Sequence, residues 1–177
     1  MMTNIYGVSL DGWFDQGSHI YPLKVQYEDT DAGGVVYHAN YLAYAERARS
    51  AGFALLDIDQ RSRLANGYAF VVASVNIQYH QPARLGDLLK VVSTTAKLTG
   101  VQIVLRQLIM SDSGINLATC EVKVVYAKLQ KSNLPEENAS KENHNSATLS
   151  GRPVRLDKDV KNKILATMPP QNHGITQ

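Results

Sequence analysis

YEDTDAGGVVYHANY, residues 27–41, places two carboxylates, Asp29 and Asp31, shortly before a Gly-Gly pair. Glycine has no Cβ atom, so backbone N–H groups beside it can approach a ligand closely. The segment leads into the predicted start of a helix, where N–H groups lack intrahelical acceptors and the dipole adds partial positive charge. We interpret it as an acid beside oriented backbone donors, an arrangement that suits hydrolysis of a thioester.

One long helix is predicted to follow this loop, from Asn40 to about Leu56. The residues of one face recur three or four positions apart: Leu42, Ala45, Arg49, Phe53 and Leu56. The body of the helix is slim because of the alanines along it, among them Ala43, Ala45, Ala48 and Ala51. A slim and mostly apolar helix packs closely against a sheet, so we expect it to be buried there.

Five strands are predicted from runs in which apolar and polar residues alternate. The first spans residues 21–27, and the other four lie between Ala69 and Tyr126. The predicted order is one strand, one helix and then four strands in a meander, which is an α+β arrangement. One helix covers a single face of such a sheet. Because several strands carry apolar residues on both faces, we expect an edge or the other face to meet a second subunit.

The two ends of the chain differ in composition from the middle. Residues 1–20 show no periodicity and are predicted to form an irregular N-terminal arm. Residues 131–150 are rich in Asn, Ser and Glu, which predicts a flexible polar linker. A short helix is expected within residues 155–166. The predicted folded domain therefore spans residues 21–130, and residues 131–177 form a linker and a C-terminal helix.

Composition argues against several classes of partner. The net charge is only +2, with no run of Lys and Arg, so we expect no nucleic-acid partner. The single cysteine, Cys120, allows no intrachain disulfide, and the five histidines lack metal-ligand spacing, so we expect no metal site. No stretch is long enough for a membrane span, and the first residues lack the features of a secretory signal. We expect a cytoplasmic protein.

Two motifs resemble those of a known family. YEDTDAGGVVYHANYLAYAERAR, residues 27–49, is similar to the signature of hot-dog-fold acyl-CoA thioesterases of the 4-hydroxybenzoyl-CoA thioesterase type. The similarity is greatest to the YbgC-type branch, which is associated with the Tol-Pal operon. The second motif, VNIQYHQPARLGD at residues 75–87, has the order and separation found in that family. The resemblance covers about residues 21–130.

The resemblance implies a fold, an activity and a site. The implied fold is a five-stranded antiparallel sheet wrapped around one long central helix, with subunits paired into a homodimer or homotetramer. The implied reaction is hydrolysis of acyl-CoA or acyl-carrier-protein thioesters without a cofactor. Asp31 is the implied nucleophile or general base, and backbone N–H groups near His38 are the implied oxyanion hole. The His38 side chain is expected to assist, and Tyr37, Tyr41 and Glu46 are candidates for substrate binding.

Plainer structural roles compete with these assignments. Asp31 could stabilise its own turn or cap the helix, which is the commonest use of Asp beside Gly. Asp29 is expected to brace the loop, and the tyrosines could serve packing alone. The dehydratase or hydratase branch of the same fold is a second enzyme hypothesis, although its loops carry a different pattern. A non-catalytic module that binds acyl-CoA or acts as a scaffold is the third hypothesis.

Overall fold

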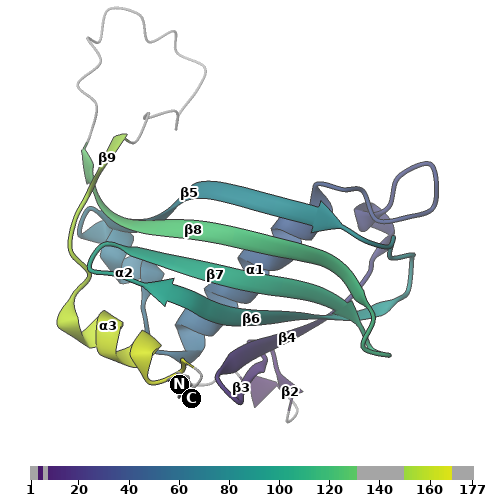
Figure 1. The fold of residues 1–177 in the computed structure, drawn as a ribbon, viewed down its shortest axis with the longest axis horizontal. Helices are drawn as coiled ribbons and strands as arrows, with labels where there is room; N and C mark the ends of the chain where they lie inside the picture. Colours follow the sequence, from purple (N-terminus) through teal and green to yellow (C-terminus); the bar gives the residue numbers. More distant parts are fainter. Residues whose placement is uncertain (1–3, 6–7, 131–149, 169–177) are drawn as a thin grey trace, which may run out of the picture.

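Alternating side chains form one large antiparallel sheet around helix α1 (Asn40–Leu55), in a computed structural model that describes residues 4–5, 8–130 and 150–168. Figure 1 shows the sheet curving across α1. In sheet order its strands are β3 (Trp13–Asp15), β4 (Ser18–Lys24), β6 (Leu88–Leu98), β7 (Gln102–Ser111), β8 (Asn116–Gln130) and β5 (Tyr68–Tyr79). A seventh strand, β9 (Ser150–Pro153), pairs with β8 beyond the start of β7.

The predicted meander is wrong at β5. Strands β6, β7 and β8 follow one another across the sheet, but β5 pairs with β8 at the far edge and not with β6. Two strands separate β5 from β6, a distance of about 14 Å at the usual strand spacing. Residues 80–87 are long enough to span it, at up to about 3.3 Å per residue. Alternation predicts the four strands after α1, and it places the first strand at 21–27, three residues beyond β4. It contains no information about which strands are neighbours.

The prediction of an irregular arm at residues 1–20 is also wrong. Short strands β1 (Asn4–Ile5) and β2 (Val8–Ser9) pair with each other, and β3 forms a hairpin with β4. Gln16 and Gly17 join β3 to β4 with positive φ angles of 44° and 81°, as a two-residue hairpin turn requires. Strands of two or three residues are too short for a periodic signal, and Gln-Gly lacks the usual Asn or Asp.

Helical segments agree with the sequence more closely. The predicted helix from Asn40 to about Leu56 is α1, and the predicted C-terminal helix is α3 (Lys158–Leu165). A short helix, α2 (Gln60–Ala65), and a 3-10 turn, η1 (Tyr27–Asp29), complete the set. The predicted linker lies outside the described residues, except for its last one, with which β9 begins. None of the described helices is long and apolar enough to cross a membrane.

The slim face of α1 lies against β4, β6, β7 and β8. Tyr44, Ala45 and Ala48 are fully buried there, as the run of alanines predicts. A buried polar network fixes this contact. Arg49 donates to Gln107 Oε1 (2.8 Å) and pairs with Glu46, while Gln107 Nε2 donates to the Ala45 carbonyl and to Ser93 Oγ (both 2.9 Å). Because buried polar groups cost stability unless they are bonded, this network favours one position of the helix on the sheet.

The edge strand β5 stays partly uncovered. Val72, Val75 and Tyr79 stand opposite buried residues of β8 and therefore lie on the face of the sheet that carries the core. Their side chains are nevertheless 40%, 41% and 47% exposed. The sheet thus presents an apolar strip beside α1 that the described part of the chain covers only in part.

His19, on β4, is a buried ionisable group far from the loop before α1. Its ring is only 3% exposed, and Nε2 lies 2.6 Å from the Asp11 carbonyl. A carbonyl only accepts, so Nε2 carries the proton, and Nδ1 has no partner among the described residues. Burial lowers the pKa of His19 from its ordinary value of 6.5, because a charged ring would lose its solvation.

We therefore expect the free energy of unfolding to fall as the pH drops below about 6.5. There the unfolded chain takes up a proton at His19 that the folded chain resists. Denaturant unfolding between about pH 7.5 and 5.5 measures this slope. His19→Gln, which can still donate to Asp11, should have a shallower slope over that range. Equal slopes for the two proteins would contradict the assignment.

Candidate functional site

Asp29 braces the loop before α1, as the sequence predicts. Its side chain is 4% exposed, and Oδ2 accepts the Gln26 N–H at 2.8 Å. Its backbone carbonyl accepts twice, from the Tyr37 N–H at 2.9 Å and from Asn40 Nδ2 at 2.8 Å. One residue therefore fastens the beginning of the loop, its end and the first residue of α1.

Asp31 lies in a tight turn at the tip of this loop. The turn closes through Gly34 N–H to the Asp31 carbonyl (3.0 Å) and Asp31 N–H to the Val35 carbonyl (2.9 Å). The Gly33 N–H donates to Asp31 Oδ1 at 2.8 Å, whereas Oδ2 meets no donor among the described residues. A Cβ atom on Gly33 would approach Oδ1 to 3.0 Å. Gly33 thus leaves room beside a carboxylate that is exposed to solvent, and Gly34 adopts a positive φ of 73° in the turn.

The peptide between Tyr37 and His38 points its N–H away from α1. The Tyr37 carbonyl accepts the Asn40 N–H at 2.8 Å, at the first turn of the helix. In a trans peptide the C=O and N–H bonds point in opposite directions, so the His38 N–H points outward. It meets no acceptor in the part of the chain that the structure describes. This is the unpaired donor that the start of a helix is expected to offer.

The two sequence motifs meet around a hollow of about 250 Å³ beside this donor. The Val36 N–H donates to the Ala83 carbonyl (2.8 Å), and the Ala83 N–H donates to Tyr41 Oη (2.9 Å). The hollow is lined by Val36, His38, Tyr41, Tyr79, His80, Gln81 and Pro82. Residues 27–41 and 75–87, far apart in the sequence, therefore form one site.

The predicted site residues are not all brought together. His38 and Tyr41 line the hollow, and Tyr37 packs beside His38 with ring centroids 4.3 Å apart. Asp31 lies in the adjoining loop and is not among the lining residues. Glu46 is five residues beyond Tyr41 in α1, about 140° around the helix. It points elsewhere and pairs with Arg49.

Three lining residues were not singled out from the sequence: Tyr79, His80 and Gln81. The Tyr79 hydroxyl donates to the His38 carbonyl at 3.0 Å, and His80 Nε2 lies 3.0 Å from Thr119 Oγ1. All three lie within the second motif, residues 75–87. That motif was the feature of the sequence that could have identified them as site residues. Burial raises the pKa of both Tyr41 and Tyr79, so each hydroxyl keeps its proton at neutral pH.

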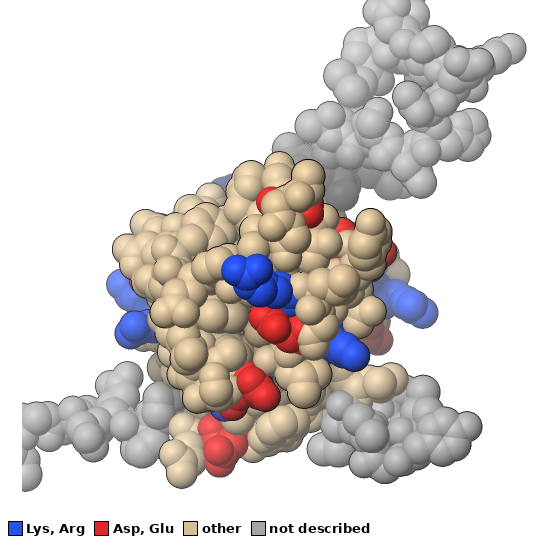
Figure 2. Space-filling model, turned by 90° about the vertical axis from the view of Figure 1, so that its right-hand side faces the viewer, with Lys and Arg blue, Asp and Glu red and all other residues tan. Residues whose placement is uncertain are grey.

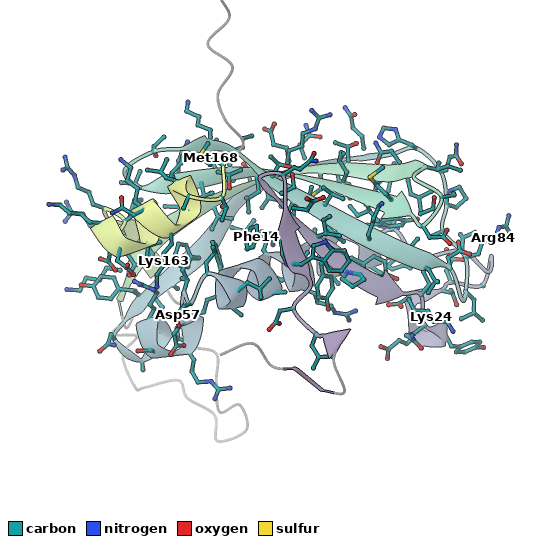
Figure 3. All side chains as sticks on the ribbon, turned by 90° about the horizontal axis from the view of Figure 1, so that it is seen from below. Phe14, Lys24, Asp57, Arg84, Lys163 and Met168 are labelled. Carbon is teal, nitrogen blue, oxygen red and sulfur yellow. The ribbon has the colours of Figure 1, made fainter. Side chains whose placement is uncertain are left out.

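The end of the molecule that carries this loop has a mixed surface. Figure 2 faces that end and shows lysines or arginines beside acidic residues, with uncharged surface between them. Arg84 lies two residues after Pro82, which lines the hollow. It is at the opposite end of the molecule from the Asp57–Lys163 ion pair (Figure 3). Among the described residues, no group of His, Cys, Asp and Glu is arranged to hold a metal ion.

Comparison with known proteins places the chain in a family. Residues 25–164 match the family model of the thioesterase-like superfamily. The acyl-CoA thioester hydrolase YbgC of Escherichia coli O157:H7 is 41% identical over 105 residues, which cover 59% of this chain and 78% of that protein. The acyl-CoA thioesterase YbgC of Haemophilus influenzae is 41% identical over 112 residues, covering 63% of this chain and 82% of its own length.

Solved structures of thioesterases have a similar fold. A probable thioesterase from Bartonella henselae is 28% identical, with a TM-score of 0.61, and the match covers 79% of this chain and 99% of the other. A 1,4-dihydroxy-2-naphthoyl-CoA thioesterase from Synechocystis is 21% identical, with a TM-score of 0.68 and coverage of 84% and 96%, and so shows the fold alone. The predicted hot-dog fold is confirmed, with two short strands added to the five expected. The chain belongs to the thioesterase-like superfamily.

Proposed function

We propose that this protein hydrolyses acyl-CoA or acyl-carrier-protein thioesters to a free acid and a thiol. The observation that carries the proposal is the His38 N–H, for which the described residues offer no acceptor. It faces outward beside a hollow and follows a loop with an exposed carboxylate. Similarity to two acyl-CoA thioesterases over most of their length supports the same reaction. Nothing in this reaction requires a metal ion or an organic cofactor.

In the proposed reaction, the His38 N–H donates to the thioester oxygen as negative charge develops on it. The Asp31 carboxylate either attacks the carbonyl carbon, giving an anhydride that water then hydrolyses, or removes a proton from an attacking water. Both routes break the C–S bond and release the thiol and the acid. Oδ2 of Asp31 is the oxygen available for either role, because Oδ1 accepts the Gly33 N–H.

We expect Asp31→Asn to fold normally and to lose roughly 10²–10⁴-fold in turnover, the usual loss when a positioned acid–base or nucleophilic group is removed. Release of thiol from a panel of straight-chain, branched and aromatic acyl-CoAs, followed with a thiol-reactive dye, measures it. Asp29→Asn is the matched control, since an amide oxygen still accepts the Gln26 N–H. Near-wild-type hydrolysis by folded Asp31→Asn would overturn the assignment.

The His38 side chain is expected to matter less than its backbone. His38→Ala keeps the N–H that holds the oxyanion, so we expect a loss of only about tenfold in turnover. The same thiol-release assay measures it. A loss as large as that of Asp31→Asn would make the imidazole a full catalytic partner.

A non-catalytic module is the second candidate function. The bond from Gly33 N–H to Asp31 Oδ1 favours it, because that bond by itself explains an Asp at the tip of a glycine turn. A protein of this kind would bind acyl-CoA without releasing thiol from any member of the panel. Asp31→Asn would then leave acyl-CoA binding unchanged.

We also propose that the protein assembles through the edge of β5 into a homodimer, and that two such dimers form a homotetramer. β5 pairs only with β8 among the described strands, so its outer edge is open, and Val72 and Val75 are exposed beside it. Open edges with apolar side chains are usually paired or covered. The hollow reaches Tyr79 on this same strand, so a second subunit would wall the site.

Light scattering at micromolar concentration should therefore give at least twice the 19.5 kDa of one chain. Val75→Lys places a charge on the open face of β5 and should shift the protein towards monomer. Lys123→Glu, on the opposite face of neighbouring β8, is the matched control and should leave the assembly intact. A stable and active wild-type monomer would refute both the assembly and the shared site.

A cytoplasmic location completes the proposal. The one cysteine, Cys120, is a buried free thiol, so the fold uses no disulfide and suits a reducing compartment. Burial raises the pKa of this thiol, which keeps it protonated and unreactive. Fractionation of cells that express the full chain tests the location directly.

A further inference from the structure

We infer that Tyr79 is a positioning residue of the oxyanion hole: its hydroxyl holds the peptide between His38 and Ala39 so that the Ala39 N–H becomes a second donor. The inference rests on the proposed thioesterase function and extends it. It assigns a role to a residue of β5. This strand is far in sequence from the loop that carries Asp31, and it contributes no acid or base. The oxyanion hole then consists of two donors, the N–H groups of His38 and Ala39.

The direction of the Ala39 N–H follows from the bond that Tyr79 makes. Tyr79 donates to the His38 carbonyl at 3.0 Å, and that carbonyl shares a peptide plane with the Ala39 N–H. Since the two bonds of a trans peptide are antiparallel, the Ala39 N–H points away from Tyr79. Ala39 is the N-cap of α1 and has helical angles (φ −69°, ψ −24°). No acceptor for its N–H lies in the described ranges of the chain.

Among the described residues, the consecutive N–H groups of His38 and Ala39 thus have no acceptor at the head of α1. Each is fixed through the carbonyl of its own peptide: Tyr37 O by the Asn40 N–H at 2.8 Å, and His38 O by Tyr79 at 3.0 Å. The first anchor is part of the helix itself. The second anchor, the Tyr79 hydroxyl, comes from the sheet. Among the described residues it makes the hydrogen bond from outside α1 that sets the tilt of the peptide between His38 and Ala39.

The Tyr79 ring is itself held in place. It meets Tyr41 edge-on, with centroids 5.5 Å apart, and His38 edge-on at 6.4 Å. Tyr41 is buried and its hydroxyl accepts the Ala83 N–H, so it forms a fixed wall for the Tyr79 ring. The raised pKa of Tyr79 keeps its hydroxyl a donor at neutral pH.

A donor on a carbonyl also strengthens the N–H of the same peptide. Chains of hydrogen bonds polarise one another, by about 10–30% per bond in condensed-phase estimates. Removing an oxyanion donor outright costs about 10²–10³-fold in turnover. Tyr79→Phe loosens and depolarises a donor without removing it, so we expect a smaller loss, about threefold to tenfold in kcat, with KM little changed.

The experiment compares Tyr79→Phe with Tyr126→Phe in the same thiol-release assay, on the acyl-CoA of the panel that the wild type hydrolyses fastest. Tyr126 Oη accepts a hydrogen bond of similar length, 2.9 Å from Arg63. Eight residues of β8 separate it from Ala118, which stands opposite Tyr79, a distance of about 27 Å. We expect kcat to fall in Tyr79→Phe alone. Light scattering and thermal unfolding check that both variants keep the assembly and the fold.

A spectroscopic readout separates positioning from a merely structural role. In Asp31→Asn, which we expect to bind substrate and hydrolyse it slowly, the infrared stretch of a ¹³C-labelled thioester carbonyl reports the hydrogen bonds to its oxygen. Adding Tyr79→Phe should raise that frequency towards its value in free acyl-CoA. Full kcat in Tyr79→Phe, or an unchanged carbonyl frequency, overturns the inference about Tyr79. The proposed function still stands in that case if Asp31→Asn loses turnover as expected. Absence of hydrolysis by the wild type overturns both.

Discussion

The backbone carbonyl of Asp29 ties the loop that carries Asp31 to the head of α1. It accepts from the Tyr37 N–H and from Asn40 Nδ2, while the Asp29 side chain closes η1 through Gln26. A carboxylate and an unpaired N–H can act on one carbonyl only if their separation is fixed. These three short bonds fix it, because they join both ends of the loop to one buried residue. Gly33 can then leave space beside Asp31 while the loop stays fixed at both ends.

The sheet supplies the second constraint on the same segment. Val36 and Tyr41 both bond to the backbone of Ala83, and Tyr79 bonds to the carbonyl of His38. The turn between the loop and α1 is therefore held by the chain on one side and by the second motif on the other. The buried network of Arg49 and Gln107 holds the body of α1 against β6 and β7. The position of the helix start thus depends on contacts along the whole helix.

Much of this arrangement could be predicted from the sequence, and the remainder could not for identifiable reasons. The alanines and the helical spacing predict α1, and the motif predicts a carboxylate beside a helix start. Neither signal shows that β5 lies next to β8, because pairing depends on contacts that alternation does not encode. The Gln16-Gly17 hairpin lacks a common turn sequence. Alternation marks Tyr79 as an ordinary strand residue, because its hydroxyl bonds to a carbonyl 41 positions away in the sequence.

The open face of β5 connects the site to the assembly. Val72, Val75 and Tyr79 lie on the core face of the sheet, yet α1 covers them only in part: Tyr41 meets Tyr79, but all three side chains stay at least 40% exposed. Extending the helix over β5 would bury them but would also close the hollow at Tyr79. In the proposed assembly, a second chain would cover the apolar strip from the edge of the sheet and still leave an entrance. The strip that one chain leaves exposed would then become part of a covered site with access for a thioester.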